Sequence, residues 1–247
     1  MRVVETGLKH GTITLYDDDD QIELTQTRVD LETDGRRAIV AHDQDWARDA
    51  ARRDFTINAL YLDSSGGIFD PLDGKADLKA GRLRFAGDAG LRVQEDALRM
   101  IRYCRLLPRF AAAGIDLQAQ TALRKHASLC AGLSGERLAN EMRRIMVGGG
   151  LKEVIGLMQD SKIDQAALGL SLDPSRLAND DEIGSMIAGL GANVDFAWLV
   201  NLAVVIPPGS AALLAKRLRL SRTEERCLTR LDLGLGDDDM TMLSRTK

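Results

Sequence analysis

The sequence predicts an α+β fold in which a strand-rich part precedes an array of helices. Two short segments near the N-terminus, 11–16 and 21–26, are rich in β-branched residues, and their side chains alternate along the chain. From Asp45 onward, apolar residues recur at the spacings of an amphipathic helix. We therefore expect a β-rich part of about 85 residues followed by helices, with element boundaries defined to within a few residues.

The strand-rich part holds three predicted strands and their turns. Four consecutive aspartates at 17–20 separate the first two strands and predict a hairpin turn, because an acidic run of this kind is typical of a solvated loop tip. A third strand is expected at 37–41, after a turn at 33–35. The stretch 63–81 is rich in turn-forming residues.

The remainder of the chain is predicted to be helical almost to its end. Ser134 and Ser221 are plausible helix starts, since each combines a capping hydroxyl with acidic residues in the first turn. The helices are expected at 91–110, 116–128, 134–147, 150–158, 180–189, 194–206, 209–218 and 221–231.

Composition excludes several classes of protein. Of the 247 residues, 45% are hydrophobic and 28% are charged, with a net charge of −4, which does not fit disordered, collagen-like or coiled-coil chains. The 3 cysteines lie far apart, so a structural zinc site is not expected. The start lacks the apolar core of a signal peptide, and the longest apolar stretch, 196–206, is too short to span a bilayer. We expect a cytoplasmic protein without a membrane partner.

Arg53 occupies an ambiguous position. If 46–60 is one helix, Arg53 lies in the middle of the apolar stripe formed by Trp46, Ala50, Ile57 and Leu60. An inward guanidinium requires an anion or a cleft, because a buried unpaired charge is costly. The alternative is a helix break near Arg52, which leaves both arginines at the surface beside Asp49 or Asp54. Spacing alone does not separate these two interpretations.

A second charged pattern is predicted on the helix at 91–110. At 100° per residue, Glu95, Arg99 and Arg102 lie within about 60° of one another, flanked by Asp96 and Arg105. Apolar residues cover the opposite face. The pattern alone favours a solvated face held by ion pairs between successive turns, since most charged helix faces are exposed to solvent and have no further role.

Two motifs resemble those of a known family. The sequences RRDFTINAL at 52–60 and EDALRMIR at 95–102 are similar to motifs of bacterial-type tRNA nucleotidyltransferases, the CCA-adding enzymes, which share their family with bacterial poly(A) polymerases. Further matches, which cover roughly 1–147 in the family's order, are FDPLDGKADL at 69–78, LSGERLANE at 133–141, GLKHGT at 7–12 and TDGRR at 33–37. The ordered set favours a functional interpretation of both charged patterns.

The resemblance implies a nucleotide-binding role for each charged residue. Asp54 would accept a hydrogen bond from the ribose 2′-hydroxyl, and Arg53 would contact the triphosphate. Asp96 and Arg99 would read the base, with Glu95 in the same nucleotide-binding set. Arg102 and Arg105, further along the helix, would contact phosphates or orient that pair.

The sequence departs from the family pattern at its start. Family members carry a Gly-Gly loop and an Asp-x-Asp strand that hold two Mg²⁺ ions, and no such segment is present here. Glu23 fits the pattern of a third catalytic carboxylate, although an exposed strand acid without a role is an equal alternative. We expect an N-terminally shortened nucleotidyltransferase whose chemistry fails without the aspartate pair.

The predicted organisation has three parts. A shortened nucleotidyltransferase head at 1–86 is followed by a helical neck at 87–150, which recognises the base, and by a helical, RNA-binding body at 151–247. The predicted function is addition of C and A residues to tRNA 3′ ends from CTP and ATP. The alternatives are poly(A) polymerase activity and a catalytically silent nucleotide- or RNA-binding remnant.

Overall fold

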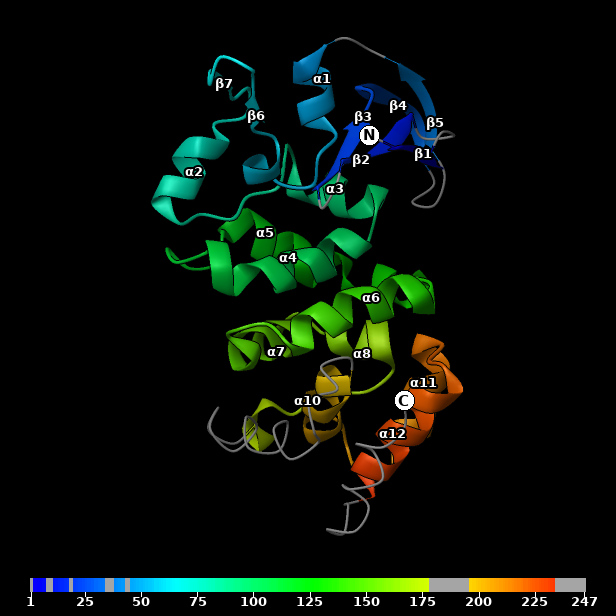
Figure 1. Ribbon diagram of the computed structural model, residues 1–247. Coiled ribbons are helices and arrows are strands. Elements are labelled where there is room, and N and C mark those ends of the chain that lie inside the picture. The colour runs from blue at the N-terminus through cyan, green and yellow to red at the C-terminus, as the bar shows by residue number, and fades with distance from the viewer. Residues whose placement is uncertain are drawn as a thin grey trace. The chain divides into compact units, whose positions relative to one another are not determined.

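The chain forms two compact units. The computed structural model describes residues 2–7, 11–17, 20–33, 38–42, 45–177 and 196–233. The first unit consists of Met1–Lys79 with Arg84–Asp88, and the second of Ala80–Leu83 with Ala89–Lys247 (Figure 1). The described strands belong to the first unit and most of the helices to the second, which confirms the predicted α+β class.

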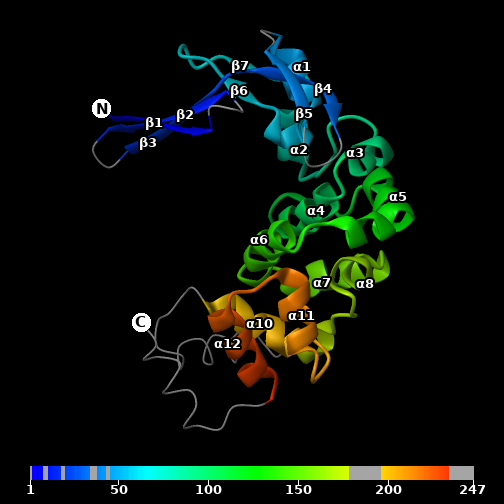
Figure 2. The same ribbon diagram turned by 90° about the vertical axis from the view of Figure 1, so that its right-hand side faces the viewer.

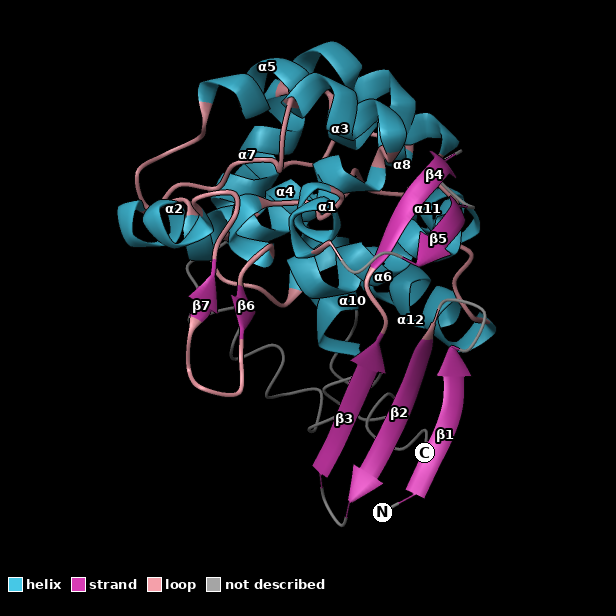
Figure 3. Ribbon diagram, turned by 90° about the horizontal axis from the view of Figure 1, so that it is seen from above, coloured by secondary structure: helices cyan, strands magenta, loops and turns pink. Residues whose placement is uncertain are grey.

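Antiparallel strand pairs open the first unit (Figure 3). β2 and β3 pair in register up to Asp17 opposite Asp20, which confirms the predicted hairpin; Asp18 and Asp19 lie outside the described residues. The third predicted strand corresponds to β5, whereas β1 and β4 were not predicted. The strands are β1 (Arg2–Gly7), β2 (Thr12–Asp17) and β3 (Asp20–Thr25) in one sheet, and β4 (Arg28–Thr33) and β5 (Ala38–His42) in another.

The segment 46–60, for which one helix and a break near Arg52 were both open, contains only a short α-helix. α1 (Trp46–Ala51) begins after Asp45, whose carboxylate accepts a hydrogen bond from the Ala47 N–H at 2.8 Å. The chain then leaves the helix and becomes extended at Phe55, which pairs with Phe85 and packs ring against ring at 5.1 Å. This long-range contact overrides the local helical spacing, so of the two open interpretations the structure has the break near Arg52 and not the single helix.

The predicted turn-rich stretch contains two regular elements. A small hairpin joins β6 (Tyr61–Leu62) to β7 (Ile68–Phe69), and α2 (Gly74–Ala80) follows. The Asp70 carboxylate accepts hydrogen bonds from the N–H groups of Gly74 and Lys75, at 2.8 and 2.9 Å, and thereby satisfies the first turn of α2. Asp70 belongs to the motif at 69–78, so one function of that motif is to cap α2.

Helices make up nearly all of the second unit (Figure 2). Their bounds are α3 (Ala89–Glu95), α4 (Leu98–Phe110), α5 (Leu117–His126), α6 (Gly135–Met146), α7 (Leu151–Asp160), α8 (Ile163–Leu168), α10 (Ala197–Val205), α11 (Ala211–Leu218) and α12 (Arg222–Asp232). The 3₁₀ turns are Thr56–Asn58 in the first unit, and Ala127–Gly132 and Pro174–Arg176 in the second.

Most of the predicted helices are confirmed, with one correction that concerns the site. The single helix expected at 91–110 is broken into α3 and α4. Ser221 caps α12 through a complete capping box with Glu224, as predicted. Ser134 precedes α6 as expected but makes no capping hydrogen bond from its side chain. The helix expected at 180–189 and parts of two quoted motifs, at 8–10 and 34–37, lie outside the described residues.

The core of the second unit is built from the apolar faces of these helices. α4 buries Met100, Ile101 and Cys104 completely, on the face that the sequence predicted. α10 is apolar on all sides and packs against both α6 and α12, which explains its burial. Among the described residues, no helix combines the length and the apolar character needed to cross a membrane.

Candidate functional site

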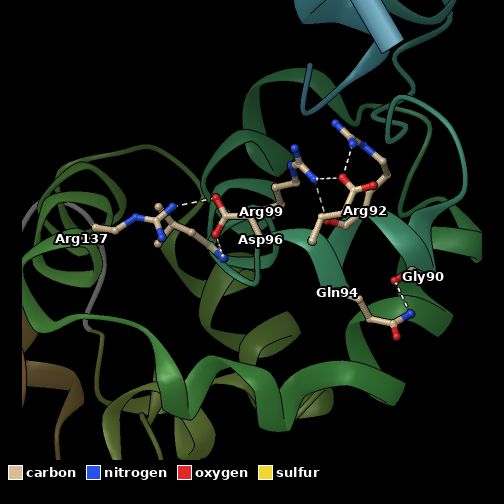
Figure 4. Close-up of polar contacts among 8 residues, drawn as sticks. Gly90, Arg92, Gln94, Asp96, Arg99 and Arg137 are labelled. Atoms are coloured by element: carbon tan, nitrogen blue, oxygen red, sulfur yellow. Dashed lines mark hydrogen bonds and ion pairs between the residues drawn. The ribbon is translucent and has the colours of Figure 1, made fainter. Parts of the chain in front are cut away.

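The break between α3 and α4 is held by the side chain of Asp96. Its Oδ1 atom accepts a hydrogen bond from the Leu98 N–H at 3.1 Å, and its backbone carbonyl accepts one from the Arg99 N–H at 3.0 Å. Both contacts satisfy N–H groups that the first turn of a helix leaves without intrahelical partners. Asp96 therefore lies at the start of α4, with its carboxylate fixed beside the helix end (Figure 4).

Arg99 lies in the first turn of α4 and is tied back to α3. Its Nη1 atom donates to Glu95 Oε2 at 2.7 Å and to the carbonyl oxygen of Arg92 at 2.8 Å. Arg92 forms an ion pair with the same Glu95 oxygen. Only 8% of Arg99 is exposed, so the guanidinium lies in a largely enclosed position. Glu95 and Arg99 thus form an ion pair across the helix break.

A third arginine reaches Asp96 from another helix. Arg137, in the first turn of α6, donates from Nη2 to Asp96 Oδ2 at 2.6 Å. Figure 4 shows Arg137 on one side of Asp96 and Arg99 on the other. Both oxygens of Asp96 therefore have partners within the chain. Arg137 belongs to the motif at 133–141, but the motif alone assigned this residue no role.

Arg102 and Arg105 share one buried carboxylate. Arg102 Nε donates to Glu141 Oε1 at 3.2 Å, and Arg105 Nε forms an ion pair with Glu141 Oε2 at 2.8 Å. Glu141 is 5% exposed, and its charge is compensated by the two arginines. Sequence reasoning missed Glu141 as well as Arg137. Their spacing of four residues, which places them on one face of α6, is a signal that could have pointed to them.

In the first unit, Arg53 belongs to a cluster around Asp49. Arg53 Nη2 lies 2.8 Å from Asp49 Oδ2, Arg52 pairs with the other oxygen, and the Tyr61 hydroxyl donates to Oδ2 at 2.7 Å. Burial alone raises the pKa of Asp49, but the hydrogen bonds from Tyr61, Arg53 and Arg52 outweigh it and lower the pKa to about 2. Burial and the hydrogen bond to Asp49 raise the pKa of Tyr61 to about 12. Arg53 therefore does not point inward along a helix, as one interpretation held.

Asp54 and Glu23 also lie in the first unit. The backbone carbonyl of Asp54 accepts a hydrogen bond from the Ala86 N–H at 3.1 Å, which fixes the main chain beside its carboxylate. Glu23 belongs to β3, a strand with exposed side chains, and lies opposite Thr14 of β2. In the part of the chain that the structure describes, no three His, Cys, Asp or Glu side chains gather where they could hold a metal ion. These residues therefore do not fit the two-ion magnesium site implied by the resemblance.

The structure brings some of the predicted residues together. Glu95, Asp96 and Arg99 meet at the junction of α3 and α4. Arg102 and Arg105 follow along α4 and face α6. The three residues at the junction combine a hydrogen-bond acceptor with an enclosed donor, an arrangement that can recognise a polar edge of a small ring.

Two family models match the chain. One, described as "Poly A polymerase head domain", matches residues 1–84. The other, described as "Probable RNA and SrmB- binding site of polymerase A", matches residues 114–167. Along the sequence, the two matches lie on either side of the junction between α3 and α4.

Curated relatives and solved structures agree with these matches. The zebrafish (Danio rerio) protein "CCA tRNA nucleotidyltransferase 1, mitochondrial" is 40% identical over 64% of this chain and 40% of its own length. The "CCA-adding enzyme" of Bacillus pumilus is 35% identical over 70% of this chain and 43% of its own length. The chain thus spans less than half of these relatives.

The fold is also similar to that of a solved enzyme. The crystal structure of the Bacillus stearothermophilus CCA-adding enzyme in complex with CTP matches with a TM-score of 0.73 and 23% identity, over 94% of this chain and 56% of that one. At this identity the likeness concerns the fold. The motifs, the family matches and the relatives converge: over the ranges that they cover, the chain is similar to tRNA nucleotidyltransferases and poly(A) polymerases.

Proposed function

We propose that this chain carries the nucleotide-recognition part of a CCA-adding tRNA nucleotidyltransferase, with CTP and ATP as nucleotides and tRNA as primer. The observation that supports this most is the junction of α3 and α4, where Asp96 lies in the break and Arg99 in the first turn of α4, each with its side chain held by hydrogen bonds. The relatives that are named CCA-adding enzymes favour this activity over polyadenylation.

Base recognition follows from the hydrogen-bonding groups of the pair. Asp96 offers acceptor oxygens and Arg99 offers N–H donors. Cytosine presents an amino donor beside the N3 acceptor, and adenine presents an amino donor beside N1. Guanine and uracil present the opposite order, so one acceptor–donor pair accepts C and A and rejects G and U. No template strand is required for this selection.

Two residues of the first unit have proposed roles of their own toward a nucleotide. Asp54 would accept a hydrogen bond from the ribose 2′-hydroxyl, which distinguishes ribonucleotides from deoxynucleotides. Arg53, whose side chain is 41% exposed, would contact the triphosphate while Asp49 holds its guanidinium from the other side. Glu95 would act by holding Arg99, and Arg102 and Arg105 by orienting the pair from α4.

We also propose a catalytic ion and a cellular location. Mg²⁺ stays the proposed ion of the family's reaction, although the described residues do not assemble a site for it. Among the described residues, Glu23 stays the proposed candidate for a catalytic carboxylate. The cytoplasm is the proposed location.

The tRNA would lie in part along α5. Gln120, Thr121, Arg124 and Lys125 line a surface hollow of about 450 Å³ on this helix, and they fall within the region that matches the RNA-binding family model. Two cations beside two hydrogen-bonding side chains suit a phosphate backbone. We expect the variant with Arg124→Ala and Lys125→Ala to bind tRNA more weakly, with a smaller salt dependence, and to retain CTP affinity.

The central test is nucleotide binding measured by calorimetry with CTP, ATP, UTP and GTP. CTP and ATP are expected to bind more tightly than UTP and GTP. Arg99→Ala removes a hydrogen bond to a charged group, which costs about 1.5–3 kcal/mol, or roughly 10- to 150-fold in affinity. Arg109→Ala, which changes an exposed arginine at the far end of the same helix, is the matched control and should leave binding unchanged. Equal affinity for all four nucleotides would contradict the proposal.

Poly(A) polymerase activity is the second candidate, since one matching family model carries that name. Binding of tRNA that ends before its CCA sequence, compared with binding of an oligo(A) strand, separates the two. The CCA-adding function predicts a clear preference for the tRNA.

A further inference from the structure

We infer that Arg137 is a positioning residue that sets the base selectivity of Asp96 without contacting the nucleotide itself. The inference rests on the proposed function, because it explains how the proposed base-reading carboxylate is held. It concerns a residue of α6, outside the helix that carries Asp96 and Arg99.

The geometry shows how the Asp96 carboxylate is fixed. One contact, from the Leu98 N–H to Oδ1, comes from the neighbouring turn of the same chain segment and is 3.1 Å long. The other, from Arg137 Nη2 to Oδ2, comes from α6 and is shorter, at 2.6 Å. A carboxylate held at a single oxygen can rotate about that contact, whereas one held at both oxygens has a fixed plane.

The fixed plane still allows a base to bind. Each carboxylate oxygen has two lone pairs, so Oδ2 can accept from Arg137 and from one more donor at the same time. The position of that remaining lone pair depends on the orientation that Arg137 imposes. Arg137 therefore determines where the amino group of cytosine or adenine must lie.

Arg137 can perform this task because α6 is itself anchored on α4. Glu141, one helical turn after Arg137, is buried between Arg102 and Arg105 of α4. α6 also packs against α4, and its apolar side chains Leu138 and Met142 are fully buried. The two helices are thus held in register, and the reach of Arg137 to Asp96 is constrained by that packing.

Arg99 is held by a separate set of contacts. Its partners, Glu95 and the carbonyl oxygen of Arg92, belong to α3. The acceptor and the donor of the proposed pair therefore have independent supports, from α6 and from α3. Loss of Arg137 should therefore disturb the acceptor, Asp96, and leave the donor, Arg99, in place. We expect this to lower the selectivity between bases as well as the affinity.

The test compares the ratio of CTP to UTP affinity in four proteins by calorimetry. Arg137→Met keeps the length and apolar packing of the side chain but removes its donors and charge; Arg137→Lys keeps a charged donor. Arg144→Ala changes an exposed arginine of α6 and is the matched control. We expect the selectivity ratio to fall about tenfold in Arg137→Met, to be partly restored in Arg137→Lys, and to equal the wild-type ratio in Arg144→Ala.

The outcomes separate the inference from the proposed function. If the wild-type chain binds CTP no better than UTP, the proposed function fails. If the wild type is selective and a folded Arg137→Met variant keeps the full ratio, only the positioning role is overturned. Should Arg137→Met melt below the assay temperature, Arg137→Lys decides the matter: an intermediate ratio supports the inference and an unchanged ratio refutes it.

Discussion

Replacing Asp49 with asparagine should destabilise the first unit by an amount that depends on pH. In the folded chain, burial raises the pKa of Asp49, but hydrogen bonds from Tyr61, Arg53 and Arg52 outweigh it and lower the pKa from 3.8 to about 2. At ~1.36 kcal/mol for each pKa unit, this difference corresponds to about 2.5 kcal/mol of stability at pH 7. An asparagine side chain retains an acceptor oxygen but not the charge, so the expected loss is about 2–3 kcal/mol.

The sign of the pH dependence follows from the lowered pKa. The contribution is fully present above the unfolded value near 3.8 and is lost as the pH falls toward about 2. At pH 3 the wild type should already have lost about 1 kcal/mol of this contribution, while Asp49→Asn loses none of it. The gap between the two proteins should therefore narrow on acidification.

Urea denaturation of both proteins at pH 7, 5, 4 and 3 measures this gap. Asp20→Asn changes an exposed carboxylate in the same unit and should shift stability by no more than about 0.5 kcal/mol. A difference between wild type and Asp49→Asn that is below about 1 kcal/mol at pH 7, or that does not change with pH, would refute the reasoning.

Three further predictions concern packing and burial. Glu141→Gln leaves two arginines of α4 without their carboxylate and should lower the stability of the second unit by about 3 kcal/mol in chemical denaturation; a loss under about 1 kcal/mol would contradict this. Gly74→Ala places a Cβ 2.2 Å from the carbonyl oxygen of Thr56 and should lower the melting temperature by several degrees, about 2 kcal/mol, unlike alanine at the open Gly132. Burial raises the pKa of the Cys104 and Cys130 thiols, so both should resist a thiol reagent at pH 8 until the chain is unfolded; rapid labelling of the native protein would disagree.

Local pattern was sufficient for the strands and most of the helices. The alternating segments at 11–16 and 21–26 became β2 and β3, because alternation has a direct structural meaning in a strand with two faces. The capping box at Ser221 was predicted from four residues and is complete in the structure. Such features depend on neighbours in the sequence, which is why the sequence alone reveals them.

The errors came from contacts that periodicity does not encode. Spacing left a single helix at 46–60 and a break near Arg52 both open, and the contact that decides between them joins Phe55 to Phe85, thirty residues further along the chain. The helix expected at 91–110 is broken where the Asp96 side chain binds the Leu98 N–H. A helical periodicity of apolar residues is compatible with both the continuous and the broken helix, so it could not predict either interruption.

The sequence predicted several residues of the candidate site but not the residues that bind them. Glu95, Asp96 and Arg99 were selected from charge pattern and family resemblance, and they meet at one junction. Arg137 and Glu141 were not selected, since their partners lie about forty residues earlier in the chain. The roles of the predicted residues toward a nucleotide, and the division into head, neck and body, stay predictions.

Asp96 combines two duties that proteins usually assign to different residues. The same carboxylate accepts a hydrogen bond from the Leu98 N–H at the start of α4 and offers the acceptor that the proposed function requires. Serine could accept from that N–H but would carry no charge, and glutamate would keep the charge but extend the side chain by one methylene. Local folding and substrate choice are therefore coupled at this position, and few substitutions can satisfy both at once.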